Sequence, residues 1–388
     1  MEVVPYSGET PRVGWAYSKN HQPYYCRRNK RSVWKREGDD TASKPERNDN
    51  RKERLCKFWA SGNCVKGDRC PFLHSWSLGD HVSIIATLKG HTQAVTGIAY
   101  PSGGDKLYSG SKDGMLRVWN CHTGQCERVF DLGAEVCSLI QEGPWIFVGL
   151  PNLVKAWNTQ SGAEFSLDGP VGQVYAMIFD KNILFAGTQN GQILVWKVRS
   201  ESETTTNPFQ PAHVLDGHTR GIVCLTIGRN MLYSGSFDGT IKKWDLGTLQ
   251  CLTTAKGHSS AVMSLTCWDY YLVSCSLDGT IKAWGATPEG GLEACYTHKE
   301  KQGVLALGGM SIPVTPNEEV RHDILFCSCD DNSVHLYELP SFEKKGSVFV
   351  RQEALSIHVQ DGNGGLFFIG DGTGLITVGK MASGVHDR

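Results

Sequence analysis

The sequence predicts an all-β fold in which repeated four-stranded units follow a small metal-stabilised module and a basic N-terminal segment. Two observations predict the repeats: similar stretches recur about every 40 residues, and Asp-Gly pairs separate alternating apolar runs, as in tight β-hairpins. A third observation predicts the small module, because residues 56–74 hold three cysteines and one histidine. With 388 residues, 40% of them hydrophobic, the chain is long enough for one large domain with attachments.

Residues 1–53 are expected to form a disordered basic segment. They are rich in polar and charged residues and show no sustained hydrophobic period. Residues 1–80 carry 16 Lys and Arg against 10 Asp and Glu, whereas residues 81–388 carry 23 against 30, so the N-terminal part is the expected nucleic-acid end. One basic cluster is a candidate nuclear import signal or phosphate contact, with a solvated charge run as the alternative: Arg27, Arg28, Lys30, Arg31, Lys35 and Arg36.

The segment 54–77 carries the clearest chemistry of the chain. Its cysteines and histidine follow the spacing C-x7-C-x5-C-x3-H, and three thiolates with one imidazole are a donor set of tetrahedral structural zinc. The segment is too short to bury a core, so bound metal is expected to supply its folding energy. The alternative is chance clustering in a chain with 14 Cys and 13 His, but Gly62 and Gly67 suit turns between the ligands. We therefore predict one structural zinc ion, with no position left for a catalytic water, at Cys56, Cys64, Cys70 and His74.

This segment closely resembles a CCCH zinc finger, including its ending Cys70-Pro71-Phe72-Leu73-His74. The resemblance implies binding of single-stranded RNA. Aromatic and basic residues between the ligands suit the same task, because aromatic rings stack on unpaired bases and cations neutralise phosphates. The alternative for Phe58 and Trp59 is that they cover the zinc site, whereas Phe72 matches the family's aromatic residue. The candidate nucleic-acid contacts are Arg54, Lys57, Phe58, Trp59, Lys66, Arg69 and Phe72.

Three stretches, residues 88–120, 215–245 and 255–285, are the clearest repeats. Each contains a Gly-His pair, two apolar runs, an Asp-Gly turn and a tryptophan. Weaker copies contain Trp157, Trp196 and Tyr337, and a final copy at residues 365–380 keeps only the turn and the apolar pattern. This makes seven units.

The units resemble WD repeats, whose four-stranded blades close into a β-propeller. The resemblance implies a seven-bladed WD-repeat β-propeller over residues 81–380, followed by a C-terminal tail at residues 381–388. The apolar segment Ser83–Leu88 is expected to complete the last blade, so that closure leaves no exposed sheet edge. Residues 199–212 and 308–322 predict long loops or elongated hairpins.

A recurring set of His, Asp and Trp belongs to the three clearest repeats. In WD repeats these residues join one hydrogen-bond network inside each blade, so the resemblance implies a scaffold role. A Ser-His-Asp catalytic site is disfavoured because the same set recurs three times, and the sequence shows no other catalytic motif. We therefore expect neither enzymatic activity nor a small-molecule substrate. The network residues are His91, Asp113 and Trp119, then His218, Asp238 and Trp244, and then His258, Asp278 and Trp284.

The remaining cysteines lie singly in apolar runs and are expected to be buried reduced thiols. The chain shows no secretory signal and no apolar run long enough to span a membrane. We expect a soluble intracellular protein without a membrane partner, located in the nucleus, with the cytoplasm as a second compartment.

The combination of one CCCH finger with WD repeats resembles the plant zinc-finger and WD-repeat protein family. It implies an adaptor that binds RNA or DNA through the finger, with single-stranded RNA favoured, and protein partners through the propeller. A duplex-DNA ligand is the first alternative, although the finger lacks the helix and second histidine of a major-groove finger. The second is a substrate receptor of a ubiquitin ligase, for which Trp196 and Arg199 approximate the motif while Lys197 replaces its aspartate. A third is a finger that contacts only protein.

Overall fold

The computed structural model describes residues 53–79, 82–101, 104–199, 207–313, 321–360 and 365–381, with only the backbone at residues 312–313. The segment predicted as a disordered tail lies outside the described residues except for Glu53, and so do its basic cluster and residues 382–388. Within the described ranges, no helix is long and apolar enough to cross a bilayer.

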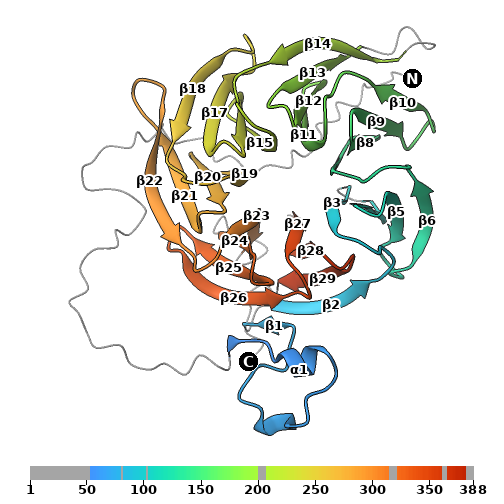
Figure 1. The fold of residues 1–388 in the computed structure, drawn as a ribbon, viewed down its shortest axis with the longest axis vertical. Helices are drawn as coiled ribbons and strands as arrows, with labels where there is room; N and C mark the ends of the chain where they lie inside the picture. Colours follow the sequence, from blue (N-terminus) through green and yellow to red (C-terminus); the bar gives the residue numbers. More distant parts are fainter. Residues whose placement is uncertain are drawn as a thin grey trace, which may run out of the picture.

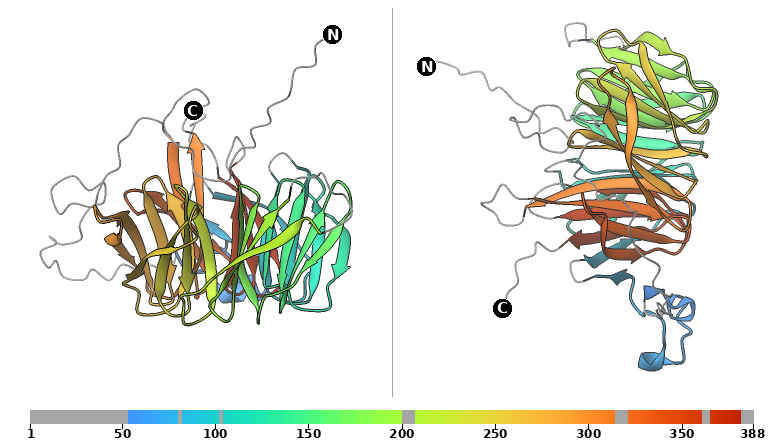
Figure 2. Two further views of the ribbon diagram at one scale, coloured as in Figure 1. Left: turned by 90° about the horizontal axis from the view of Figure 1, so that it is seen from above. Right: turned by 90° about the vertical axis from the view of Figure 1, so that its left-hand side faces the viewer.

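Seven antiparallel sheets form a closed ring around a central channel (Figure 1). Six sheets have four strands, and the sixth blade has five because a short strand from the N-terminal side joins it. The predicted all-β, seven-bladed propeller preceded by a zinc finger is confirmed. In edge view the sheets stand side by side, and the finger projects from the rim (Figure 2).

Blades 1 to 4 each use four consecutive strands, and in each blade the first strand lies at the channel and the fourth at the rim. Their strands are β3 (Val95–Ala99), β4 (Lys106–Ser111), β5 (Met115–Asn120) and β6 (Cys126–Asp131); β7 (Ser138–Glu142), β8 (Trp145–Leu150), β9 (Leu153–Asn158) and β10 (Glu164–Leu167); β11 (Val174–Asp180), β12 (Ile183–Thr188), β13 (Ile193–Val198) and β14 (Phe209–Leu215); and β15 (Ile222–Gly228), β16 (Met231–Ser236), β17 (Thr240–Asp245) and β18 (Cys251–Lys256).

Blades 5 to 7 continue the ring, and the last two take strands from the N-terminal side of the chain. Their strands are β19 (Val262–Trp268), β20 (Tyr271–Ser276), β21 (Thr280–Ala286) and β22 (Leu292–Lys299); β23 (Val304–Pro313), β24 (Arg321–Cys329), β25 (Ser333–Leu339), β26 (Glu343–Phe349) and β1 (Ser77–Leu78); and β27 (Ala354–Val359), β28 (Leu366–Asp371), β29 (Ile376–Met381) and β2 (Val82–Leu88). The finger holds helix α1 (Lys57–Ala60) and one 3-10 turn (Gly67–Arg69).

The ring closes through β2, which pairs antiparallel with β29 from Val82↔Met381 to Leu88↔Ile376. This outer strand was predicted from the apolar run before the first repeat. On the channel side, the Ser356 hydroxyl of blade 7 donates to the Val95 carbonyl of blade 1 at 3.0 Å. The first and last parts of the ring are therefore joined at both its inner and outer edges.

The hydrophobic core is divided among the blade interfaces. Seven clusters of buried side chains occur in the described residues, one between each pair of neighbouring blades. Buried and less buried residues alternate along strands such as β5. Successive side chains point to opposite faces of the sheet, and one face packs more tightly against its neighbouring blade than the other. The repeated Asp-Gly turns have the expected backbone, with φ of 81° at Gly114 and 78° at Gly239.

The predicted elongated hairpin in residues 308–322 is present as β23 and β24, which pair from Val304↔Cys329 to Pro313↔Arg321. It rises above the other blades in Figure 2. In the other long stretch, residues 209–212 already belong to β14, and residues 200–206 lie outside the described residues.

The thirteen described cysteines are all free thiols, but the expectation that those outside the finger are buried was only partly right. Cys224, Cys275, Cys327 and Cys329 are buried, whereas Cys121 and Cys251 are exposed. Cys121 lies in the turn between β5 and the rim strand β6, and Cys251 begins the rim strand β18, where one side faces solvent.

Candidate zinc centre and nucleic-acid interface

Two backbone hydrogen bonds fold the ends of the finger together. The amide of Cys56 donates to the Leu73 carbonyl at 2.9 Å, and the amide of Leu73 donates to the Arg54 carbonyl at 2.9 Å. This short parallel bridge sets Cys56 beside the segment that carries His74. Between them, positive φ values at Gly62 (77°) and Gly67 (50°) let the chain turn, as the sequence suggested.

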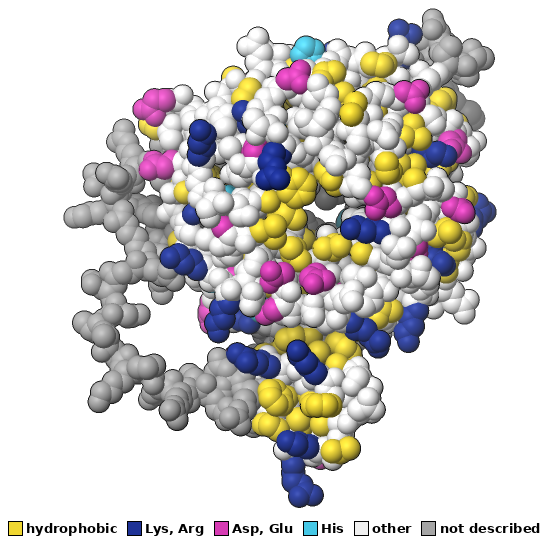
Figure 3. Space-filling view, in the orientation of Figure 1, with side chains coloured by type: hydrophobic (Ala, Val, Ile, Leu, Met, Phe, Trp, Pro, Cys, Tyr) yellow, Lys and Arg dark blue, Asp and Glu magenta, His cyan; other side chains and the backbone are white. Residues whose placement is uncertain are grey.

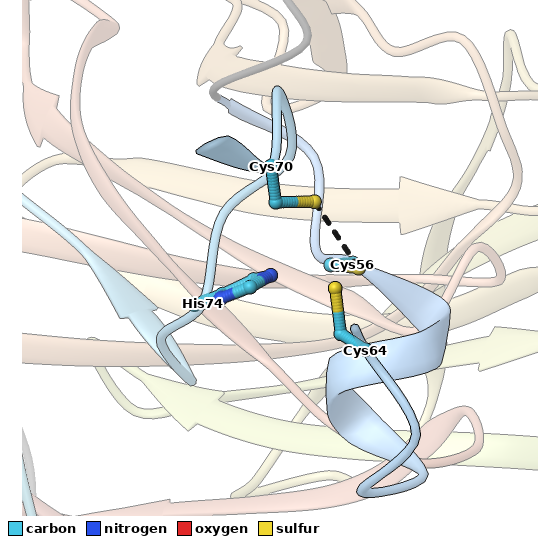
Figure 4. A group of neighbouring side chains, drawn as sticks. All are labelled: Cys56, Cys64, Cys70 and His74. Atoms are coloured by element: carbon cyan, nitrogen blue, oxygen red, sulfur yellow. Dashed lines mark hydrogen bonds between the residues drawn. The ribbon is translucent and has the colours of Figure 1, made fainter. Parts of the chain in front are cut away.

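The four predicted zinc ligands converge on one point. Their ligand atoms all lie within 4.8 Å of one another, and the side chains point inward from three parts of the finger (Figure 4). The sulfur atoms of Cys70 and Cys56 are 3.6 Å apart. Zinc–sulfur bonds of about 2.3 Å in a tetrahedron put neighbouring sulfurs about 3.8 Å apart, so the spacing fits the ion.

Two further observations fit a metal at this point. The Nε2 atom of His74 is buried and has no hydrogen-bond partner among the described residues, as expected for a nitrogen that binds an ion. Burial acts to raise the pKa of Cys56, but hydrogen bonds from the Trp59 amide and from the other ligands lower it to about 7. The Phe72 amide acts to lower the pKa of Cys70, but burial and the contacts with Cys56 and Cys64 raise it, so Cys56 is the first of the two to become a thiolate. Within residues 53–79, Cys56 is the one buried residue, so a hydrophobic core does not hold the finger together.

Trp59 lies against the zinc ligands rather than pointing into solvent. Its ring stacks on the His74 imidazole, with centroids 5.7 Å apart and planes inclined by 11°, and it also contacts Trp76 at 5.7 Å. Of the two roles considered for Trp59, this geometry favours covering the zinc site.

Phe58 and Phe72 have the opposite placement. Phe58 is 70% exposed and Phe72 is 40% exposed, although both are large apolar side chains next to zinc ligands. The four predicted cationic contacts are also exposed, namely Arg54, Lys57, Lys66 and Arg69. Figure 3 shows hydrophobic side chains on the finger with Lys and Arg at its edges. The surface thus offers aromatic faces next to positive charge.

The finger is joined to blade 6, a contact that the sequence did not reveal. Strand β1 pairs with β26 through Ser77↔Val348 and Leu78↔Ser347, and the Phe349 amide donates to the Trp76 carbonyl at 2.9 Å. The guanidinium of Arg351 lies 5.8 Å from the centre of the Trp76 ring. A two-residue strand is too short to show a period, so the sequence did not predict this pairing.

The three predicted scaffold networks share one geometry. In blade 1, His91 Nδ1 lies 3.0 Å from Asp113, while Trp119 Nε1 donates to Ser109 Oγ at 2.8 Å. The Ser109 hydroxyl lies 2.8 Å from His91 Nε2 and can donate to it, which leaves the Nδ1 hydrogen for the aspartate.

Blades 4 and 5 repeat this arrangement closely. The histidine–aspartate distance is 3.0 Å both for His218 and Asp238 and for His258 and Asp278. Trp244 donates to Ser234 at 2.9 Å, and Trp284 donates to Ser274 at 2.7 Å. The central serine was not singled out from the sequence, although it stands at the same offset before the Asp-Gly turn in all three repeats.

Trp196, considered for ubiquitin-ligase recruitment, is buried, while Lys197 and Arg199 are exposed at the end of blade 3. The exposed residue next to the tryptophan is thus a cation. Elsewhere on the propeller, a cavity of about 460 Å³ is lined mainly by blades 4 and 5 and also by residues of blades 6 and 7. Its lining includes Arg229, whose guanidinium lies 3.6 Å from the centre of the Tyr270 ring.

Comparison with known proteins agrees with both parts of this structure. A family model described as WD domain, G-beta repeat matches residues 82–120, 209–245 and 249–285, and a zinc finger domain model of the CCCH class matches residues 56–74. The chain is 51% identical to Zinc finger CCCH domain-containing protein 17 of Oryza sativa subsp. japonica, over 84% of this chain and 72% of that protein. It is 52% identical to Zinc finger CCCH domain-containing protein 48 of Arabidopsis thaliana, over 85% of this chain and 74% of that protein.

The fold also resembles a solved structure. A computationally designed protein, Ika8, superimposes with a TM-score of 0.56 at 24% identity and covers 77% of this chain and 99% of its own. At this identity the match concerns the fold alone.

Proposed function

This chain belongs to the plant CCCH zinc-finger and WD-repeat protein family, and we propose that it is a zinc-dependent adaptor whose finger binds single-stranded RNA. The propeller is the part that holds a protein partner. On this proposal the protein is not an enzyme, and it acts in the nucleus, with a cytoplasmic pool as the alternative.

One observation carries the choice of RNA-type ligand: Phe58 and Phe72 expose 70% and 40% of their surfaces beside the zinc ligands. An aromatic face stacks on a base only when that base is not already stacked in a duplex, so such residues favour single strands. The four exposed cations supply phosphate contacts. Helix α1 has only four residues, which is too short for the recognition helix of a major-groove reader.

The role of the propeller is supported by its charge and surface. Residues 81–388 carry 30 Asp and Glu against 23 Lys and Arg, which disfavours nucleic acid spreading over the whole ring. The cavity next to Arg229 and Tyr270 offers a recess for a partner's side chain. A rigid ring with the finger at its rim would hold RNA and protein at a fixed separation.

The test is a fluorescence anisotropy titration of the full chain with a single-stranded RNA pool, the matching single-stranded DNA and a DNA duplex of equal length. RNA should bind most tightly, and the logarithm of its affinity should fall with the logarithm of salt concentration by about 0.7 per phosphate contact. Phe58→Ala and Phe72→Ala should each weaken RNA binding by about 5-fold to 150-fold, equivalent to about 1–3 kcal/mol of lost stacking.

Val65→Ala is the matched control, because Val65 is 97% exposed in the same finger and is not aromatic. Its RNA affinity should equal that of the wild type. Cys70→Ser should abolish the RNA preference, since the finger then lacks a zinc ligand. Equal affinity for all three nucleic acids, unchanged in Cys70→Ser, would show that only the basic segment binds phosphate and would overturn the proposal.

A further inference from the structure

Blade 6 replaces the scaffold network of blades 1, 4 and 5 with residues of different chemistry. Glu300 precedes its first strand where blade 1 has His91, and Tyr337 follows the turn aspartate Asp331 where blade 1 has Trp119. Cys329 stands two residues before that aspartate, at the position of Ser111 in blade 1. The substitutions bring a carboxylate, a thiol and the imidazole of His335 into one place.

These three groups are as close to one another as the ligands of the finger. Their donor atoms all lie within 4.8 Å of one another. His335 Nδ1 is 3.2 Å from Glu300 Oε1 and 3.8 Å from Cys329 Sγ. A second imidazole lies at the rim of the cluster, where His298 Nε2 is 3.6 Å from the same carboxylate oxygen.

The hydrogens available in this cluster do not satisfy its acceptors. Asp331 accepts at 2.5 Å from the Ser333 hydroxyl, which uses the single hydrogen of that hydroxyl. The Ser333 oxygen lies 3.0 Å from His335 Nε2, and this contact is favourable only if Nε2 carries a hydrogen. In a neutral ring Nδ1 is then an acceptor, and it faces the Glu300 carboxylate oxygen at 3.2 Å.

In the other neutral tautomer of His335, Nδ1 carries the hydrogen and can donate to Glu300. Nε2 then faces the Ser333 oxygen, and if the Ser333 hydroxyl donates to Asp331 there is no hydrogen between these two atoms. The Tyr337 hydroxyl offers no remedy, since its one hydrogen is donated to Glu300. Blades 1, 4 and 5 have no such conflict, as their histidines accept from a serine and donate to an aspartate. Around His335 and Glu300 the acceptors thus outnumber the hydrogens, and a bound cation would satisfy them.

The spacing of the donor atoms fits a bound metal ion. Zinc bonds of about 2.0–2.3 Å in a tetrahedron separate the donors by about 3.3–3.8 Å, close to the observed 3.2, 3.6 and 3.8 Å. The hydrogen bond from His335 Nε2 to Ser333 is the outer contact that metal-binding histidines commonly make.

We propose that Glu300, Cys329 and His335 bind a second transition-metal ion of the zinc class, with His298 as a fourth ligand at the solvent side. The side chains of His298 and His335 are 18% and 16% exposed, which leaves a path for entry. His298 lies in β22 of blade 5, whereas Cys329 and His335 lie in β24 and β25 of blade 6. The ion would join two adjacent blades, and blade 6 also carries the finger.

The first experiment measures metal content of the full chain by mass spectrometry after dialysis against zinc-free buffer. The wild type should hold two zinc ions per chain, Cys70→Ser one, Cys329→Ser one and the double variant none. Cys329→Ser should fold, because serine occupies this position in blades 1, 4 and 5. Cys251→Ser is the control, because Cys251 is exposed in β18 of blade 4 and belongs to neither group of ligands. This variant should keep two ions.

The second experiment tests the ligands directly by cobalt substitution. Cys70→Ser chains loaded with Co²⁺ should show a thiolate-to-cobalt absorption band, and this band should disappear in Cys70→Ser/Cys329→Ser and weaken in Cys70→Ser/His335→Ala. One zinc per wild-type chain that is lost in Cys70→Ser overturns the proposal. A cobalt band that survives unchanged in Cys70→Ser/Cys329→Ser also overturns it, because the thiolate would then not be Cys329.

Discussion

The Trp59 indole lies almost parallel to the His74 imidazole, with 5.7 Å between ring centroids and 11° between the planes. This contact fixes the orientation of a zinc ligand from outside the coordination sphere. We predict that Trp59→Ala weakens zinc affinity by about 10-fold to 100-fold, as for other changes in residues that support metal ligands. Competition with a chromophoric chelator measures the affinity.

Phe58→Ala is the comparison for this prediction, since Phe58 is the next residue but is 70% exposed. Its zinc affinity should match the wild type while its RNA affinity falls. Wild-type zinc affinity in Trp59→Ala would show that the stacking does not support the site.

Cys70→Ser is expected to unfold the finger and to leave the propeller's melting temperature within about 2 °C of the wild type. The reason is that the seven hydrophobic clusters all lie between blades and contain no finger residue. Differential scanning calorimetry measures the propeller transition. A drop of many degrees would mean that finger and propeller unfold as one cooperative unit.

Gly346→Ala should detach the finger from blade 6 without disturbing its zinc ligands. A β-carbon at residue 346 would lie 2.6 Å from the Leu78 carbonyl oxygen, so β1 could not keep its place on β26. We expect the Phe349 amide, which donates to Trp76, to exchange with solvent about tenfold faster. Hydrogen exchange with mass spectrometry checks this.

Glu343→Ala supplies the control, because Glu343 begins the same strand but has an exposed side chain and no partner in β1. Its exchange at Phe349 should be that of the wild type. Unchanged exchange in Gly346→Ala would mean that the finger is not held by this pairing.

The propeller should lose stability as the pH falls below about 6.5. Burial lowers the pKa of His91, His218 and His258 below their ordinary value, despite the aspartate that each contacts. Each histidine stays neutral in the fold while the unfolded chain takes up a proton, so its contribution is complete above about pH 6.5 and is lost toward acid. The slope is at most about 1.4 kcal/mol per pH unit for each histidine.

Urea unfolding between pH 7.5 and pH 5 measures this slope. Replacing one network histidine, as in His218→Gln, should reduce the slope, whereas His122→Gln at the exposed His122 should not. Further loss is expected in stronger acid: burial acts to raise the pKa of Asp238, but hydrogen bonds from Thr240 and Thr219 lower it to about 2. Its contribution is therefore present above about pH 3.9 and is lost as the pH falls toward 2. A stability independent of pH from 7.5 to 5 would contradict the prediction.

The sequence predicted those parts of the molecule whose signals are local and repeated. The ligand spacing at Cys56 and His74 marks the finger, and the recurring Gly-His, Asp-Gly and Trp mark the blades. Even ring closure was predictable, because the strand Val82–Leu88 is apolar and precedes the first repeat without a partner nearby.

The rest depends on contacts between distant residues that no local pattern encodes. The pairing of Leu78 with Ser347 rests on backbone hydrogen bonds, which any side chain permits. The cluster around Glu300 was missed because its members come from the loop after β22 and from strands β24 and β25, and none of them has the residue type of the repeat pattern. Likewise, only the tertiary structure separates Trp59, stacked on His74, from the exposed Phe58.

The pairings of β1 with β26 and of β2 with β29 have a consequence for the order in which the protein is made. A ribosome releases the finger early, whereas the strands to which these N-terminal segments attach are synthesised last. The nascent finger is therefore expected to fold on zinc as an independent module before the ring exists. Closing so long a loop is slow compared with local folding, so the newly made chain passes through an open state in which β2 has not yet paired with β29.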